Sequence, residues 1–168
     1  MDVATVGAVT PPTEPADEAP TDHLPRRARL ERIMRRDGSR CVWCGRHLGD
    51  GLVPATTEHV VPRIKGGPSW IENEVAACTR CNGERGHRTP AEWLDECERR
   101  GWDPSPKLIV ASLERLAQAI ERRGGQRRAR PYLASQLRRL HRRSSYLPKL
   151  DVRGAPEPGG WSPPNDPG

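Results

Sequence analysis

Hydrophobic residues recur at helical spacing along four stretches of the chain. Residues 24–38 carry a short apolar stripe that stops at a glycine. Residues 89–101 begin with a threonine cap, a proline at the first helical position and a glutamate three residues after the cap. Residues 105–123 and 131–144 carry longer apolar stripes, separated by a double glycine. The pattern therefore predicts four helices, and the last two should form a helical hairpin.

The stretch between the first two of these helices has another pattern. Residues 52–61 are rich in β-branched residues and predict a strand, and the glycines at 66–67 turn the chain after it. Residues 74–78 (EVAAC) predict a short return strand. Residues 79–86 begin as a further helix. We expect two strands followed by a helix in this part of the chain.

Composition limits the core that these elements can build. The chain has 168 residues, of which 34% are hydrophobic and none is Phe. A domain with so little core material usually needs a metal or a disulfide to stabilise it. Proline-rich or glycine-rich segments without periodicity, residues 1–23 and 148–168, are expected to be disordered. We expect an α+β domain at 24–103 and a basic helical hairpin at 104–147.

Charge is distributed unevenly along the chain. The net charge is +6, yet residues 1–22 contain five acidic residues and no Lys or Arg, whereas residues 122–143 contain nine arginines and no acidic residue. Such a basic body favours a polyanionic partner, nucleic acid before an anionic membrane surface; a solvated arginine-rich surface is the alternative. With no apolar run of membrane-spanning length and no signal-peptide pattern, we expect a cytoplasmic protein.

The cysteines predict a metal site. Cys41 and Cys44 form one Cys-x-x-Cys pair, and Cys78 and Cys81 form another. Four thiolates in two pairs suit a tetrahedral structural Zn²⁺, and a reducing compartment disfavours disulfides. A redox-active pair would need a neighbouring βαβ unit, which the sequence lacks. Cys97 is left over and is expected to be an inert thiol.

Four polar residues that lie between the two cysteine pairs or directly after the second could take part in hydrolysis of a phosphodiester bond. Glu58 and Asn82 offer the oxygen ligands that Mg²⁺ accepts, and His59 can take a proton from water near neutral pH. Asn73 precedes the return strand. Each residue alone also has a structural explanation, as a strand-end surface residue, a turn former or a neighbour of the zinc ligands. Their joint position inside the cysteine pairs favours the catalytic interpretation.

Four blocks of the sequence, in order, carry a resemblance to a known family. The segments CVWCG, TTEHVVPRIKGG, NEVAAC and CNGERGHRTPAEWL resemble the HNH endonucleases, the zinc-binding branch of the ββα-metal (His-Me finger) nucleases, from about Arg36 to Leu94. The resemblance implies a small ββα-metal core with structural zinc and flanking helices. It implies that His59 is the general base and that Asn73 braces the loop between the strands. Glu58 and Asn82 match the ligands of the catalytic cation.

The sequence departs from the family pattern at two positions. Glu58 stands where most members have Asp, and Arg85 stands where many have Lys. We expect Arg85 to keep a phosphate contact, with further contacts from Arg88 and from the hairpin arginines Arg127, Arg128 and Arg130. His87 is expected to be an exposed residue at a helix end.

Together these patterns predict a metal-dependent HNH endonuclease that hydrolyses phosphodiester bonds in double-stranded DNA. Its cofactors would be structural Zn²⁺ and catalytic Mg²⁺ or a similar divalent cation, and no protein or membrane partner is indicated. Two alternatives stay open. One is a catalytically silent, zinc-stabilised nucleic-acid-binding or adaptor protein, and the other is a nuclease directed at RNA.

Overall fold

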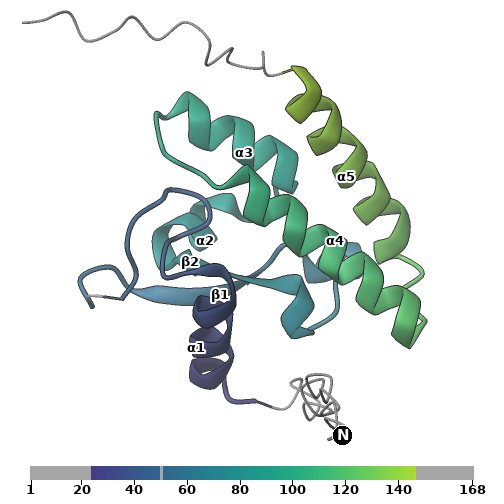
Figure 1. The fold of residues 1–168 in the computed structure, drawn as a ribbon, viewed down its shortest axis with the longest axis horizontal. Coiled ribbons are helices and arrows are strands. Elements are labelled where there is room, and N and C mark those ends of the chain that lie inside the picture. Colours follow the sequence, from purple (N-terminus) through teal and green to yellow (C-terminus); the bar gives the residue numbers. More distant parts are fainter. Residues whose placement is uncertain (1–23, 50, 147–168) are drawn as a thin grey trace, which may run out of the picture.

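The computed structural model describes residues 24–49 and 51–146, so the predicted disordered segments 1–23 and 148–168 lie outside the described residues. The described residues form five α-helices and one two-stranded antiparallel sheet (Figure 1). The elements are α1 (Arg26–Asp37), β1 (Ala55–His59), the 3-10 helices η2 (Arg63–Lys65) and η3 (Ile71–Asn73), β2 (Glu74–Cys78), α2 (Thr79–Arg85), α3 (Pro90–Arg99), α4 (Pro106–Arg123) and α5 (Ala129–Tyr146). The predicted α+β class is confirmed. None of the helices described here has the length and apolarity to cross a membrane.

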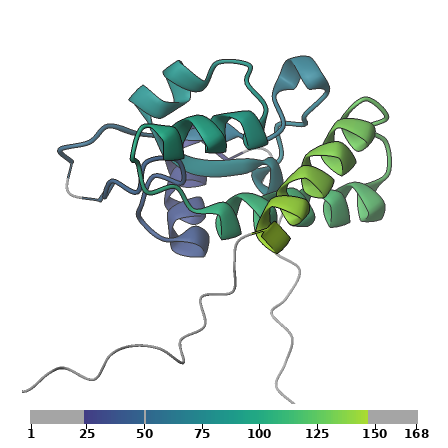
Figure 2. The same ribbon diagram turned by 90° about the horizontal axis from the view of Figure 1, so that it is seen from above.

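The predicted helices are present with nearly their expected bounds. Helix α3 begins with the predicted capping box, in which the Thr89 hydroxyl accepts a hydrogen bond from the backbone N–H of Glu92 and the Glu92 carboxylate accepts one from that of Thr89. Helix α4 ends before Gly124, as predicted. Helices α4 and α5 pack against each other as the expected hairpin (Figure 2). Local sequence signals therefore suffice for these elements.

Strand β1 is shorter than the predicted strand at 52–61. It pairs with β2 from Ala55, opposite Cys78, to His59, opposite Glu74. Beyond His59 the N–H of Val60 still donates to the carbonyl oxygen of Asn73, but the N–H of Val61 donates to the Asn73 side chain, so the ladder does not continue. The prediction of a ten-residue strand was therefore wrong, since its partner strand has only five residues.

The loop after β1 requires both glycines. Gly66 has a φ of +85°, a left-handed conformation that residues with a Cβ rarely adopt. At Gly67 a Cβ would lie 1.9 Å from the carbonyl oxygen of Val61, so any other residue would displace the chain there. The two glycines thus let the loop fold back against the end of β1, beside His59.

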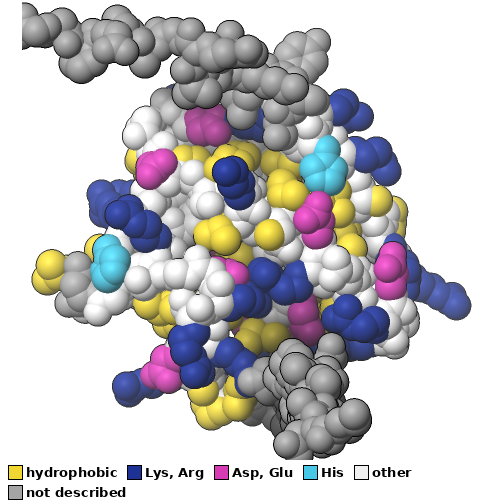
Figure 3. Space-filling view, in the orientation of Figure 1, with side chains coloured by type: hydrophobic (Ala, Val, Ile, Leu, Met, Phe, Trp, Pro, Cys, Tyr) yellow, Lys and Arg dark blue, Asp and Glu magenta, His cyan; other side chains and the backbone are white. Residues whose placement is uncertain are grey.

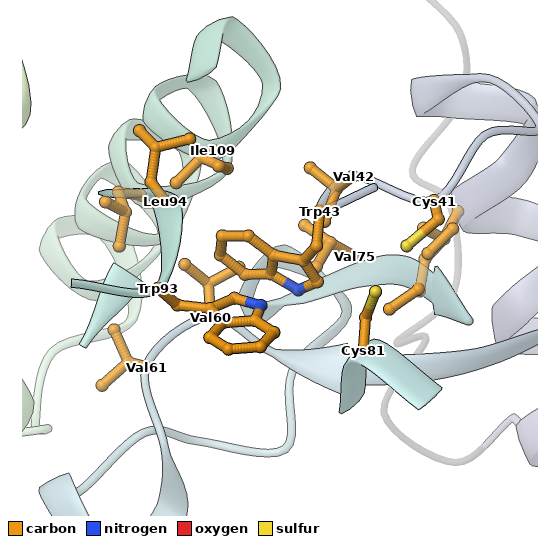
Figure 4. Close-up of a cluster of buried hydrophobic side chains, with 14 of the residues drawn as sticks. Cys41, Val42, Trp43, Val60, Val61, Val75, Cys81, Trp93, Leu94 and Ile109 are labelled. Carbon is orange, nitrogen blue, oxygen red and sulfur yellow. The ribbon is translucent and has the colours of Figure 1, made fainter. Parts of the chain in front are cut away.

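A single hydrophobic core joins the sheet to the helices. Trp43 and Trp93 lie at its centre, fully buried, with Leu94 of α3 and Ile109 of α4 beside them (Figure 4). Trp93 also packs edge-to-face on Trp102, with ring centroids 6.0 Å apart. The tryptophans provide the large aromatic surface that a chain without Phe otherwise lacks. The same core holds the α4–α5 hairpin against the rest of the domain.

Candidate active site and metal cluster

The four predicted zinc ligands meet in one buried cluster. The Sγ atoms of Cys41, Cys44, Cys78 and Cys81 all lie within 4.8 Å of one another, and those of Cys44 and Cys78 are 3.9 Å apart. A tetrahedral zinc with bonds of about 2.3 Å needs sulfur atoms about 3.8 Å apart, so the spacing fits such an ion. The sequence brings the pairs together because Cys41 and Cys44 follow α1, while Cys78 ends β2 and Cys81 lies in the first turn of α2.

Two backbone N–H groups donate hydrogen bonds to sulfur atoms of this cluster. The backbone N–H of Cys78 donates to Sγ of Cys41 at 3.3 Å, and that of Cys81 donates to Sγ of Cys78 at 3.4 Å. Hydrogen bonding by the Cys81 thiol lowers the pKa of Cys41 to about 5, whereas burial raises that of Cys44 to about 11. Cys97 lies outside the cluster, and burial raises its pKa to about 12. The short distances between the sulfur atoms and the N–H bonds to sulfur suit four metal ligands, and the raised pKa of Cys97 suits an unreactive thiol.

A cavity of about 440 Å³ brings three of the four predicted catalytic residues together. Glu58, His59 and Asn82 line it, and Glu74 contributes a second carboxylate. The remaining lining residues come from the N-terminal part of the described chain, from β1 and from the loop before η3: Leu24, Arg26, Arg29, Thr57 and Ser69. Asn82 lies next to β1, and its amide nitrogen makes a long hydrogen bond of 3.5 Å to the carbonyl oxygen of Thr57.

His59 is the last residue of β1 and reaches the cavity from the sheet. Its side chain is 26% exposed, and Nε2 lies 3.6 Å from a carboxylate oxygen of Glu74. Burial lowers the pKa of His59 to about 4, with further lowering by the positive charges of Arg63, Arg29 and Arg85. The imidazole is therefore neutral at neutral pH and can accept a proton.

Asn73 lies outside the cavity lining and is fully buried. Its amide oxygen accepts a hydrogen bond of 2.9 Å from the N–H of Val61, and its amide nitrogen donates to the carbonyl oxygens of Val61 and Pro68 at 3.0 and 2.9 Å. These bonds tie the two ends of the loop to each other directly after His59. The side chain thus braces the loop between the strands.

Glu58 is held by two donors from other elements. Arg85 of α2 donates to one carboxylate oxygen at 2.5 Å, and the indole N–H of Trp43 donates to the other. Burial raises the pKa of Glu58, while the Arg85 charge lowers it. Each carboxylate oxygen has a second lone pair, so Glu58 can still offer an oxygen to a cation in the cavity. Glu58 and Asn82 thus carry oxygen donors of the kind that a hard divalent cation accepts.

Arg85 is buried, so the fold does not offer it to a phosphate at the surface, unlike the expectation from the sequence. The residue is 1% exposed, and its guanidinium also donates to the carbonyl oxygens of His59 and Val60, at 2.9 and 2.7 Å. It stacks 5.0 Å from the centroid of the Trp43 ring. Because α2 packs against β1, the long side chain is directed into the domain, where it pairs with Glu58.

The other predicted nucleic-acid contacts are exposed. Arg88 is exposed next to α3 and lies over the Trp93 ring. Arg127, Arg128 and Arg130 are exposed in and after the turn between α4 and α5. Arg128 donates to the carbonyl oxygen of Ile64 at 3.2 Å, so this turn touches the loop that follows His59. Lys and Arg side chains gather on the face between α1 and this turn (Figure 3).

Sequence reasoning missed Glu74, Arg29 and Trp43 as parts of the site. Glu74 could have been found, because it is an acidic residue at the start of the apolar strand EVAAC. Carboxylates are rarely buried without a partner, so its position predicts a nearby positively charged or hydrogen-bonding group. His87 is exposed, as expected, and belongs to no cluster of metal-binding side chains in the described ranges. A larger cavity, of about 1020 Å³, lies between the segment after α1 and helices α3–α5 and has none of the predicted catalytic residues in its lining.

Comparison with protein families gives one match. Residues 41–97 match the family model described as HNH endonuclease. This segment contains both cysteine pairs, the β1–β2 hairpin and α2. Comparison with curated proteins and with solved structures gave no match.

Proposed function

We propose that this chain, whose residues 41–97 belong to the HNH endonuclease family, is a metal-dependent endonuclease that hydrolyses phosphodiester bonds in double-stranded DNA. The observation that carries the proposal is the cavity in which neutral His59 lies beside the oxygen donors Glu58 and Asn82. A base and a cation site in one cavity are what phosphodiester hydrolysis requires.

His59 is the proposed general base. Water attacks the phosphorus as the bond to the departing sugar oxygen breaks, and the imidazole takes the proton that the water loses. The imidazole is neutral before the reaction, so it is ready to accept this proton. Asn73 keeps the loop behind His59 in one conformation, and this limits movement of the base.

Glu58 and Asn82 are the proposed ligands of the catalytic cation, Mg²⁺ or a similar ion. When bound, such an ion stabilises negative charge on the phosphate and on the departing oxygen. Arg85 and Trp43 hold the Glu58 carboxylate in place, which offsets the extra freedom of a side chain one methylene longer than Asp. The four-cysteine cluster is the proposed structural zinc site.

The exposed arginines of the α4–α5 turn support the proposed nucleic-acid partner. The turn touches the loop after His59, so a phosphate backbone that reaches the cavity would also pass near Arg127, Arg128 and Arg130. Arginine contacts to phosphates give affinity without reading sequence. We therefore expect binding that depends strongly on salt.

A plasmid-nicking assay at low salt, with a parallel assay on an RNA substrate, tests the proposal. The wild type, His59→Ala and the matched control His87→Ala would be compared with Mg²⁺, with Mn²⁺ and without added cation, after their zinc content has been measured. We expect cation-dependent cleavage by the wild type and by His87→Ala, and a rate at least about 100-fold lower for His59→Ala.

Three results of this assay would contradict the proposal in different ways. Cleavage that survives in His59→Ala would exclude His59 as the base. Cleavage of RNA but not of DNA would favour the RNA-directed alternative. A folded, zinc-loaded wild type that cuts neither nucleic acid with any cation would favour a binding or adaptor protein.

A further inference from the structure

His59 and Glu74 are a cross-strand pair. They lie directly opposite each other in the β1–β2 ladder, and side chains at opposite positions of an antiparallel pair point to the same face of the sheet. His59 Nε2 is buried and makes no hydrogen bond within the described chain, although it lies 3.6 Å from a Glu74 carboxylate oxygen. A buried ring nitrogen without a partner next to a carboxylate calls for an explanation.

Glu74 is itself held from a second element. Arg29 of α1 donates to both carboxylate oxygens of Glu74, at 2.9 and 2.6 Å, and also to the carbonyl oxygen of Ser69 at 2.7 Å. Both charged residues are buried. The carboxylate oxygen nearest to His59 is the one that Arg29 contacts at 2.6 Å. Helix α1 therefore keeps the Glu74 carboxylate in one position against the imidazole.

We propose that Glu74 is a positioning residue for His59 and that its carboxylate keeps the proton of the neutral imidazole on Nε2. The Nδ1 atom is then the nitrogen that accepts a proton from water. This inference rests on the proposed function of His59 as the general base. The present separation of 3.6 Å is longer than a hydrogen bond, and catalytic hydrogen bonds are often long before substrate binds.

The competing explanation is that the Arg29–Glu74 pair only fastens α1 to the sheet. The two explanations differ in what a neutral replacement does. Glu74→Gln alone leaves Arg29 buried without its full counter-charge, and this should destabilise the fold. The double variant Arg29→Gln/Glu74→Gln removes both charges, so it should regain much of the lost stability but not the carboxylate that faces His59.

Two measurements on the full chain test the inference. The first is the tautomer of His59 at neutral pH, observed by ¹⁵N NMR of histidine-labelled protein, with His59→Ala to assign the signal. The second is cleavage kinetics for both variants and for the matched control Glu72→Gln, which also breaks a Glu–Arg pair, at 2.6 Å to Arg123, but lies outside the cavity lining.

We expect the wild type to carry the proton on Nε2 and both Glu74 variants to show a mixture of tautomers. Their kcat should fall by about 10- to 100-fold with little change in KM, as for other residues that orient a functional histidine, while Glu72→Gln should cut like the wild type. A wild-type proton on Nδ1 would overturn the inference. The inference would also be overturned if the double variant Arg29→Gln/Glu74→Gln regained the wild-type kcat as well as the wild-type melting temperature.

The NMR result separates this inference from the proposed function. If the wild type cuts no nucleic acid, the proposed function fails. The tautomer then still decides the inference: an Nε2 proton that is lost in the Glu74 variants upholds it, and an unchanged tautomer in those variants refutes it.

Discussion

Replacing Arg85 with alanine is expected to lower the free energy of unfolding, not the intrinsic affinity of the folded protein for nucleic acid. Arg85 makes one ion pair and two further hydrogen bonds to backbone carbonyls, all inside the domain. Its removal leaves the Glu58 carboxylate buried with the Trp43 indole as its one remaining hydrogen-bond donor among the residues described.

The size of the effect follows from this burial. Removing one partner of a buried ion pair costs about 3–5 kcal/mol, because the remaining charge is left uncompensated. For a domain of this size the loss corresponds to a fall in Tm of about 10 °C or more. A surface arginine that only contacts phosphate should change stability by no more than about 0.5 kcal/mol.

Urea unfolding followed by tryptophan fluorescence, together with DNA affinity measured over a range of salt concentrations, provides the assay. Arg88→Ala is the matched control, because Arg88 lies three residues away and is exposed. We expect the large loss of stability for Arg85→Ala alone. The salt dependence of the affinity should stay unchanged in Arg85→Ala, since the side chain of that residue is buried.

The opposite pattern would refute this reasoning. If Arg85→Ala unfolds at the same urea concentration as the wild type but binds DNA with a weaker salt dependence, then Arg85 contacts phosphate after all. The inward orientation of its side chain would then not describe the protein in its complex with DNA.

Three further predictions concern other parts of the chain. Cys41→Ser should lose zinc and unfold at a lower temperature, measured by metal analysis and thermal melting; unchanged zinc content would exclude the cluster as the zinc site. The folded-state pKa of His59, about 4 against an ordinary 6.5, means that the unfolded chain takes up this proton first as the pH falls. Between pH 7 and pH 4 the wild type should therefore lose roughly 1–3 kcal/mol more stability than His59→Asn at equal zinc content, and equal losses would contradict the lowered pKa. Replacing Arg127, Arg128 and Arg130 together by alanine should reduce the slope of log affinity against log salt by up to about 3, and an unaltered slope would make them ordinary surface residues.

Much of the fold could be predicted because its signals are local. Helical spacing, the capping box before α3 and the double glycine after α4 each act within a few residues, and they set where these helices begin and end. The Cys-x-x-Cys spacings likewise predicted the four-cysteine cluster. The strand at 52–61 was predicted too long because strand length depends on a distant partner.

The site was predictable in its residue types but not in its contacts. His59 on a strand end, between the cysteine pairs, could be assigned from the sequence as a candidate base. The partners of the two glutamates could not: Arg85 is 27 residues from Glu58, and Arg29 is 45 residues from Glu74. Since a helical arginine can point outward or inward, its partner depends on how the helix docks.

The sequence by itself therefore determined the order of the elements, the metal-binding cysteines and the histidine at the end of β1, because spacing along the chain is sufficient for each. The tertiary structure alone decided that Glu58 is held by Arg85 and that Glu74 faces His59. Those contacts need the register of β1 on β2 and the docking of α1 and α2 on the sheet, and both depend on packing between residues far apart in the chain.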